Sequence, residues 1–341
     1  MASASTMPAQ QQLEQPTSAS HQPPISIDTQ HDDMVHDVQL DYYGCKMATC
    51  SSDRTVKIFD VNGDQYNHTA TLQGHEGPVW EVAWAHPKFG AVLASCSFDS
   101  TVLLHRESRP HVWQPLYTHR FHESSVNSVA FAPHEHGLML ACASSDGRVS
   151  VLTHQNDDSW TSSVLRDSAL GVNAVSWAPY TPTDSAEEFS SLSLVTGGCD
   201  NRIRFWTHAQ GQSAVGAEWV EETDVLGGTL RHTDWVRDVA WAPGSTTSKM
   251  TMVASCSEDG TVIVWTRTTS VEGGEGKWMP ALLHTFDGPV WRLSWSVTGH
   301  ILAVSSGDDS VTLWKANLDG TWQEVSTVEE VGAGGATSDT H

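Results

Sequence analysis

Four residues in the C-terminal half of the chain have the types needed either for nucleophilic catalysis or for a buried hydrogen-bond network. They are His232, Ser255, Asp259 and Trp265. In a hydrolase, His232 would take the proton of the Ser255 hydroxyl while a carboxylate orients the imidazole. The sequence favours a structural tetrad, because it has no Gly-x-Ser-x-Gly motif and because partial copies of the set recur along the chain. An indole N–H only donates, so Trp265 suits a closed network in which buried polar groups satisfy one another.

An aspartate follows a run of small residues at six places, in segments such as "ATCSSDRTVKIFDV" and "ASCSEDGTVIVW". Successive copies are separated by 46, 47, 54, 59 and 49 positions. Periods of about 40 to 45 residues with four short strands each are typical of WD40 propeller blades, and we assign the excess to loops. The repeat turn aspartates are Asp53, Asp99, Asp146, Asp200, Asp259 and Asp308.

A histidine precedes the aspartate in most repeats, ahead of an alternating strand pattern. The first repeat keeps His31, Thr49 and Asp53 but ends in Phe59, and the second keeps His75, Ser95 and Asp99 but ends in His105. In the fourth and sixth repeats, Ser168 and Phe286 replace the histidine, so the full tetrad occurs only in the fifth. We expect the aspartate to persist in all six because its carboxylate also accepts backbone N–H groups in its own turn.

Each repeat resolves into four strand patterns, which in the second are "GPVWEVAW", "AVLASCS", "TVLLHR" and "WQPLYTH". Alternating apolar residues, β-branched side chains and close turns indicate strands, and the fifteen Trp suit packing of one sheet on another without any cofactor. The sequence therefore predicts an all-β protein, a six-bladed WD40 β-propeller. We expect a disordered N-terminal tail at residues 1–30, the propeller at 31–328 and a flexible C-terminal tail at 329–341.

The two ends of the repeat array predict an open ring. Many WD40 rings are closed because the first strand completes the last blade, but no strand pattern precedes the first repeat here. The array starts with "MVHDVQL", an inner strand, and ends with "TWQEVSTVEE", which can serve as the sixth blade's own outer strand. We therefore expect a gap between the first and sixth blades. We also expect it to be an interaction site, because an exposed apolar flank usually marks one. The residues expected to flank this partner-blade groove are Val38, Leu40, Leu302 and Leu313.

Composition excludes several other classes of function. Lys plus Arg number 18 against 41 Asp plus Glu, and the net charge of −23 opposes binding to nucleic acid or anionic lipid. The 18 His form no His-Glu-x-x-His motif and the six Cys form no Cys-x-x-Cys pair, so we expect no metal and reduced cysteines. The glycines of residues 271–277 lack the ending of a phosphate-binding loop. No apolar run reaches membrane length and no signal-peptide pattern is seen, so we expect a cytoplasmic or nuclear protein.

Longer phrases carry a more specific resemblance, which spans about residues 31 to 330. The chain closely resembles, in its fungal form, the WD40 subunit shared by the outer cage of COPII vesicle coats and the Y-shaped scaffold complex of the nuclear pore. The phrases are "HDDMVHDVQLDYYGCKMATCSSDRTVKIFDV", "GHEGPVWEVAWAHPKFGAVLASCSFDSTV", "SSVNSVAFAPHEHGLMLACASSDGRVSVL" and "GVNAVSWAP". The insertion at 180–191 and the N-terminal tail depart from that family.

This resemblance implies a non-enzymatic scaffold whose open six-bladed propeller is completed by a seventh blade supplied in trans. The implied partners are the α-solenoid coat subunit of COPII and a solenoid nucleoporin, with a nutrient-signalling complex as a third association. The implied locations are peripheral: endoplasmic reticulum and COPII vesicle membranes, the nuclear envelope at its pores, and the vacuolar or lysosomal membrane. No membrane insertion, small-molecule substrate or cofactor is implied.

Two other functions compete with the scaffold. A generic WD40 adaptor, such as a ubiquitin-ligase substrate receptor, would read short peptides and would need a basic central mouth, but only 18 basic residues are available in the whole chain. A propeller hydrolase would need a convergent acid and base outside the repeats, and the sequence has no such constellation.

Overall fold

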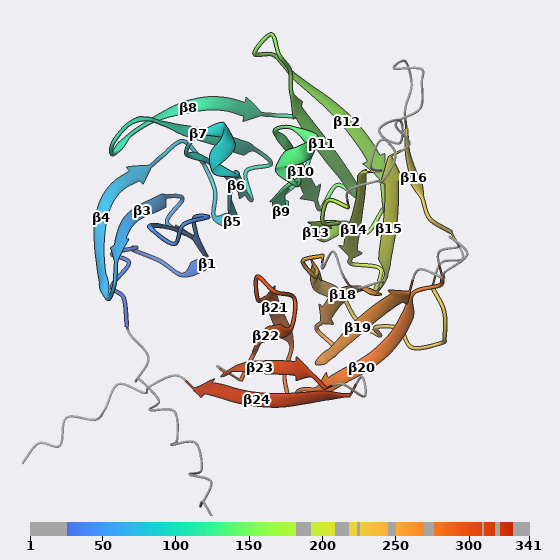
Figure 1. Cartoon of the computed structure of the whole chain (residues 1–341). Helices are drawn as coiled ribbons and strands as arrows, with labels where there is room; N and C mark the ends of the chain where they lie inside the picture. The colour runs from blue at the N-terminus through green and yellow to red at the C-terminus, as the bar shows by residue number, and fades with distance from the viewer. Residues whose placement is uncertain are drawn as a thin grey trace, which may run out of the picture.

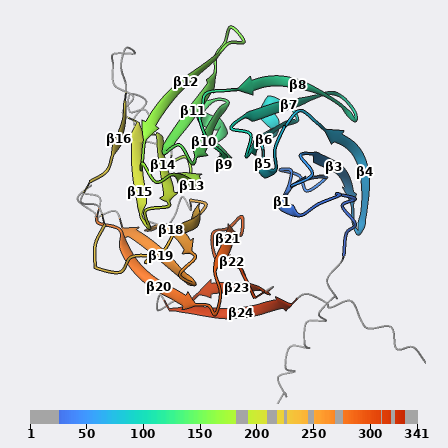
Figure 2. The same ribbon diagram turned by 180° about the vertical axis from the view of Figure 1, so that it is seen from behind.

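The computed structural model describes residues 26–181, 192–208, 218–223, 226–244, 250–268, 276–308, 310–317 and 321–329. Within these residues, six four-stranded antiparallel sheets stand as blades around a ring (Figure 1). The view from behind shows the same order of blades (Figure 2). The prediction of an all-β, six-bladed propeller is confirmed. Most of the expected N-terminal tail, nearly all of the insertion at 180–191 and nearly all of the expected C-terminal tail lie outside the described residues.

Each blade consists of four consecutive strands, and the first in sequence is the innermost. Blades 1 to 3 contain β1 Val35–Leu40, β2 Lys46–Ser51, β3 Val56–Asn62 and β4 Gln65–Leu72; β5 Val79–Trp84, β6 Val92–Ser97, β7 Val102–Arg109 and β8 Val112–His119; β9 Val126–Phe131, β10 Met139–Ser144, β11 Arg148–His154 and β12 Trp160–Arg166. Blades 4 to 6 contain β13 Val172–Trp177, β14 Leu192–Gly198, β15 Ile203–His208 and β16 Trp219–Glu221; β17 Val236–Trp241, β18 Met250–Ser257, β19 Thr261–Thr268 and β20 Met279–Thr285; β21 Val290–Trp295, β22 Ile301–Ser306, β23 Ser310–Ala316 and β24 Trp322–Glu329. Two short 3-10 turns, η1 Pro87–Phe89 and η2 His134–His136, join inner to second strands in blades 2 and 3.

The inner strand of every blade bulges at its second residue. In β1 the register shifts between Val35 and Asp37, and the same shift occurs in the other five inner strands. A bulge re-aims the side chain next to it, so the third residue of each inner strand takes a special direction. We call these six residues the channel positions: Asp37, Glu81, Ser128, Ala174, Asp238 and Arg292.

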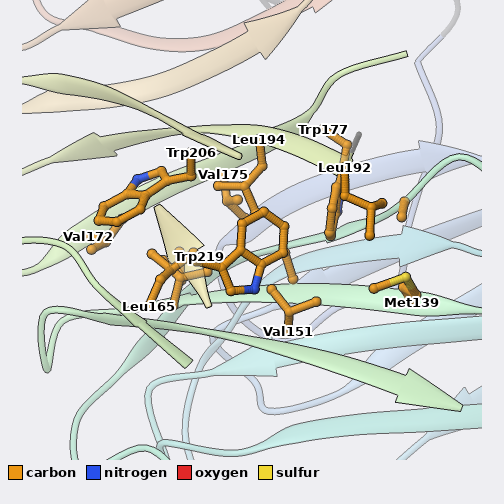
Figure 3. Packing of buried hydrophobic residues seen from close by; sticks show 14 residues of the cluster. Met139, Val151, Leu165, Val172, Val175, Trp177, Leu192, Leu194, Trp206 and Trp219 are labelled. Carbon is orange, nitrogen blue, oxygen red and sulfur yellow. The ribbon is translucent and has the colours of Figure 1, made fainter. Parts of the chain in front are cut away.

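The hydrophobic core lies between neighbouring blades. Figure 3 shows one such interface, where Met139, Val151 and Leu165 of blade 3 meet residues of blade 4 such as Leu194 and Trp219. Second strands covered on both faces are buried along their whole length, as "VLASCS" in β6 and "MLACAS" in β10 are. The continuous small apolar runs in the repeats are therefore explained by neighbours on both sides.

Among the strands that the structure describes, the first and last blades of the ring each lack a neighbour on one side. Every sheet uses only consecutive strands, so within the described residues no strand of blade 1 completes blade 6. In β22 of blade 6, buried and half-buried residues alternate, which is the pattern of a strand covered on one face only. Figure 1 shows the sixth blade, in red, and the first, in blue, as the two ends of the ring.

The structure corrects one residue of the expected groove. Leu302 is fully buried and packs with Trp314 against blade 5, so it faces the closed junction and not the gap. Side chains of a strand alternate between its two faces. The pairing of β22 with β23 places Leu302 beside Trp314 and Leu313 on the opposite face, whereas the sequence analysis placed both leucines in the groove.

Candidate functional site: buried tetrads and an open junction

The structure brings the four predicted tetrad residues together in blade 5. His232 Nε2 lies 2.7 Å from Ser255 Oγ, and Trp265 Nε1–H donates to the same oxygen over 2.9 Å. His232 Nδ1 lies 2.9 Å from Thr261 Oγ1 and 3.5 Å from Asp259 Oδ2. Ser255 is fully buried, and its hydroxyl is engaged by two ring nitrogens. The set is thus a closed network with the hydroxyl turned away from solvent.

Each repeat turn aspartate holds its own turn. In all six, Oδ1 accepts the backbone N–H of the residue two positions later, over 2.9, 2.9, 2.9, 3.3, 2.9 and 3.2 Å in chain order. Burial alone would raise the pKa of these carboxyls, but hydrogen bonds from Thr55 and His31 lower the pKa of Asp53 to about 2. Similar bonds hold the pKa of Asp99 and Asp259 well below the usual range.

The incomplete sets of blades 1 and 2 keep their histidine contacts. His31 lies 2.7 Å from Asp53 and 2.9 Å from the Thr49 hydroxyl. His75 makes the same pair of contacts, 3.0 Å to Asp99 Oδ2 and 2.9 Å to Ser95 Oγ. The residues that replace the tryptophan, Phe59 and His105, are buried, so the network loses its indole donor and the position stays filled.

Blades 3 and 6 take their hydroxyl from a different strand, which sequence reasoning missed. In blade 3, His119 Nε2 and His122 Nε2 lie 3.0 and 2.8 Å from Ser150 Oγ, on the third strand β11. In blade 6, Trp314 Nε1–H donates to Thr312 Oγ1 of β23 over 2.8 Å. The available signal is a Ser or Thr two residues before the position of the tryptophan.

Blade 4 replaces the histidine with an ion pair. Asp167, one position before Ser168, accepts the Thr196 hydroxyl and lies 2.9 Å from Arg204 Nη1. Arg204 also contacts the repeat aspartate, Asp200. The signal is an arginine between the apolar residues that begin the third strand, "IRFWTH". Burial of the Asp167 carboxyl raises its pKa despite the attraction of Arg204.

Side chains at the channel positions bind the next blade. Asp37 accepts the N–H of Val82 over 3.1 Å, and Glu81 accepts that of Val129 over 2.8 Å. At the next junctions Ser128 accepts the N–H of Val175 over 3.3 Å and Asp238 that of Leu293 over 2.8 Å. Ala174 has no polar side chain, and there Ser176 accepts the N–H of Trp241 over 3.0 Å. A hydrogen bond from a backbone N–H to a side-chain oxygen therefore ties each of blades 1 to 5 to its successor.

The gap walls differ from the closed junctions. The Val38 side chain is 49% exposed and that of Leu40 is 55% exposed, on the face of blade 1 opposite its contact with blade 2. On blade 6, Val311 is 37% exposed and Leu313 is half-buried. We call Val38, Leu40, Val311 and Leu313 the gap walls. Val311 was not among the expected groove residues, although its place three positions after Asp308 was a signal for it.

The described residues also form a cavity, and they contain no group of side chains that could hold a metal ion. A cavity of about 550 Å³ opens at the ends of inner strands from blades 1 to 5, with Leu40, Trp84, Phe131 and Trp241 among its lining residues. Among the described residues, no three His, Cys, Asp or Glu side chains are placed to hold a metal ion. The described helices include none that is long and apolar enough to cross a membrane.

Comparison with known proteins defines the class of this fold. The WD domain, G-beta repeat (WD40) family matches residues 22–60, 66–106, 161–207, 225–266 and 280–315, and the anaphase-promoting complex subunit 4 WD40 domain matches 91–179. A chain in the crystal structure of the mitotic checkpoint complex has a TM-score of 0.60 at 21% identity, with 83% of this chain and 74% of that chain covered. The chain is therefore a WD40 β-propeller.

Curated relatives narrow the class to one family. "Protein transport protein sec13" of Emericella nidulans is 47% identical, with 88% of this chain and 96% of the relative covered. "Protein SEC13 homolog" of Drosophila melanogaster is 48% identical, with 87% and 81% covered, and "Protein transport protein SEC13" of Mycosarcoma maydis is 41% identical, with 92% and 97% covered. The chain belongs to the Sec13 family.

Proposed function

We propose that this chain is a non-enzymatic scaffold of protein transport whose open junction receives one blade from a partner protein. The observation that carries the proposal is the pair of apolar gap walls. Val311 and Leu313 stand where blade 5 has Val262 and Val264, which are fully buried against blade 6. Among the described residues, nothing covers the same positions on blade 6, so a seventh blade would bury them.

The polar contacts at the gap support the same occupant. At four junctions the fourth residue of the inner strand donates its backbone N–H to a side chain of the preceding blade, as Val82 does to Asp37. Val38 occupies that position in blade 1, in the same register after the same bulge. Its N–H therefore points toward the gap, and an inner strand with a side-chain acceptor would satisfy it.

The family suggests which proteins supply this blade. We infer an α-solenoid subunit of the COPII outer cage as one partner and a solenoid nucleoporin of the nuclear pore Y-complex as another, with a nutrient-signalling complex as a third association. The chain would then act at endoplasmic reticulum and vesicle membranes and at the nuclear envelope without inserting into lipid. The buried Ser255 hydroxyl argues against a hydrolase in the same fold.

Co-expression with a partner segment of about three strands tests this function. Binding should raise the melting temperature of the complex through mass action, because the segment binds the folded chain and not the unfolded one. Affinity purification followed by mass spectrometry should recover large α-solenoid proteins. Recovery only of short phosphorylated peptides would favour a peptide-reading adaptor instead.

The matched variants Leu313→Asp and Val297→Asp locate the site. Val297 is 94% exposed in the turn after β21, and Gly299 of that turn lies against Pro243 of blade 5, so Val297→Asp should bind the segment like the parent. Leu313→Asp should bind at least tenfold more weakly, since a charge would be buried against the incoming sheet, a cost of about 1.4 kcal/mol or more. Equal binding by both variants would exclude the gap as the docking site.

A further inference from the structure

Arg292 departs from the rule that four of the other five channel positions follow. Four of the five preceding channel positions carry Asp, Glu or Ser, and each of these accepts a backbone N–H from the next blade. Arg292 stands at the same position of the last blade, but a guanidinium only donates and cannot accept such a bond. Its partners must therefore be sought elsewhere.

The Arg292 side chain crosses the ring instead of turning toward the gap. Its Nη1 donates to Glu81 Oε1 over 2.9 Å, and its Nη2 donates to the backbone carbonyl of Trp80 over 3.3 Å. Both acceptors belong to β5 of blade 2, whereas Arg292 belongs to β21 of blade 6. The side chain thus connects two blades that are not neighbours along the chain or around the ring (Figure 1).

The charges around Arg292 favour this position. Burial alone would lower its pKa, but attraction by Glu81, Asp37 and Asp238 raises it, so the guanidinium stays charged. These three carboxyls occupy channel positions of blades 2, 1 and 5. One cation therefore faces acids from blades 1, 2 and 5, and a neutral side chain there would leave three acids close together.

We propose that the Arg292 side chain is a strut across the centre of the ring. It fixes blade 6 relative to blade 2 and so sets the width of the gap that a closing blade enters. Only the role of the gap as a docking site rests on the proposed function. Within the described part of the chain, blade 6 packs against the ring only through its junction with blade 5. The bonds of Arg292 supply a second attachment, and two attachments restrict the rotation of a blade about a single junction.

Double electron–electron resonance between two nitroxide labels can measure the width of the gap in the free chain. Labels on Asn67 of β4 and Gln323 of β24, both exposed, lie on the outer strands of the two blades that flank the gap. The background carries Cys45→Ser and Cys199→Ser, because Cys45 is exposed and Cys199 half-buried while the other four cysteines are buried.

Two variants remove the strut from either end. Arg292→Met keeps the length of the side chain but loses charge and donors. Glu81→Gln keeps an oxygen that can accept the Val129 N–H but weakens the contact with Arg292. Both should broaden the distance distribution across the gap or move its maximum, and Arg292→Lys should fall between Arg292→Met and the parent because it keeps the charge with a single donor head.

Arg204→Met is the matched control. Arg204 pairs with Asp200 of blade 4 and with Asp167 in the segment between blades 3 and 4, so its loss should lower the melting temperature while leaving the gap distribution unchanged. Unchanged distributions in both Arg292→Met and Glu81→Gln would overturn the strut, and if Arg292→Met does not fold, Glu81→Gln decides alone. A gap that Arg204→Met broadens equally would also overturn it. Failure of any partner blade to bind would contradict the proposed function without altering this result.

Discussion

The junction between blades 5 and 6 and the gap between blades 6 and 1 are built from the same strand positions, yet they differ in burial. In the closed junction, Val262 and Val264 of β19 are fully buried against Leu302, Val304 and their neighbours. On the open side, Val311 of β23 is 37% exposed although it occupies the same place relative to its repeat aspartate.

Each repeat therefore carries apolar residues for both faces of its blade, whether or not a neighbouring blade covers both faces. Isolated exposed apolar residues are ordinary on protein surfaces. Val311 and Leu313 differ because every equivalent position in the closed junctions is covered by the next blade. Their apolar character is therefore evidence for an absent neighbour and not merely for a tolerated surface residue.

The largest effect is expected from a charge placed in the closed junction. Val264→Asp puts an unpaired carboxylate into a fully buried position, which should cost about 4 kcal/mol or more and leave little folded protein. Leu313→Asp, which puts an aspartate at the matching place in blade 6, should cost about 1 kcal/mol because the side chain there reaches solvent. Urea unfolding of both variants measures the difference.

Equal destabilisation by these two variants would contradict the open gap. It would mean that the wall at Leu313 is covered in the free chain in solution, by a second copy or by another segment. Measuring both variants at several protein concentrations would separate these cases, since only self-association depends on concentration.

A second contrast lies in the turn aspartates. Asp259→Ala removes the acceptor of the Thr261 and Thr233 amides in a complete tetrad, and should cost about 1 to 3 kcal/mol without affecting any chemistry. Asp308→Ala should cost less, because Asp308 is exposed and blade 6 has Phe286 in place of the histidine. Thermal unfolding checks the order of the two. An Asp259→Ala variant that melts like the parent but loses a hydrolytic activity would refute the structural interpretation.

The sequence predicted the blades because each repeat carries its own turn aspartate and strand pattern, which are local signals. It predicted the tetrad of blade 5 for the same reason. It did not predict Ser150, Arg204 or Thr312, since these partners lie on other strands and meet only when the sheet forms. Leu302 was misplaced because β22 and β23 pair Leu302 with Trp314, and register decides which face a residue takes.

The pH dependence of stability should distinguish the carboxyls at the channel positions from those of the repeat turn aspartates. Burial, with Asp37 and Asp238 nearby and Arg292 opposing, raises the pKa of Glu81 to about 7. The folded chain then binds more protons than the unfolded one between about pH 4.3 and 7, so the Glu81 contribution to stability falls as pH rises through this window. The turn aspartates act oppositely: Asp53, with its pKa of about 2, loses its contribution as pH falls from about 4 toward 2.

Glu81→Gln should therefore flatten the stability profile above pH 5 by roughly 2 to 3 kcal/mol while leaving the acid limb unchanged. Urea unfolding at intervals from pH 3 to 8 measures both limbs. The buried Asp238, whose pKa burial raises to about 6, will keep part of the slope in the variant. A Glu81→Gln profile parallel to that of the parent would show that Glu81 titrates normally and that the channel carboxyls do not act together.

The smallest effect is expected from removing the N-terminal tail, and it sharpens the contrast between closed and open junctions. Residues 1–30 show no apolar period in the sequence, and residues 26–34 carry no strand in the structure. Deleting residues 1–30 should leave the melting temperature and partner binding nearly unchanged, because a segment that buries little apolar surface adds little stability. Extending the deletion through His31 should lower the melting temperature, since His31 contacts Asp53 and Thr49. If the shorter deletion already lowered stability, the chain's own tail would be covering a gap wall, and the gap would be closed in the free protein without any partner.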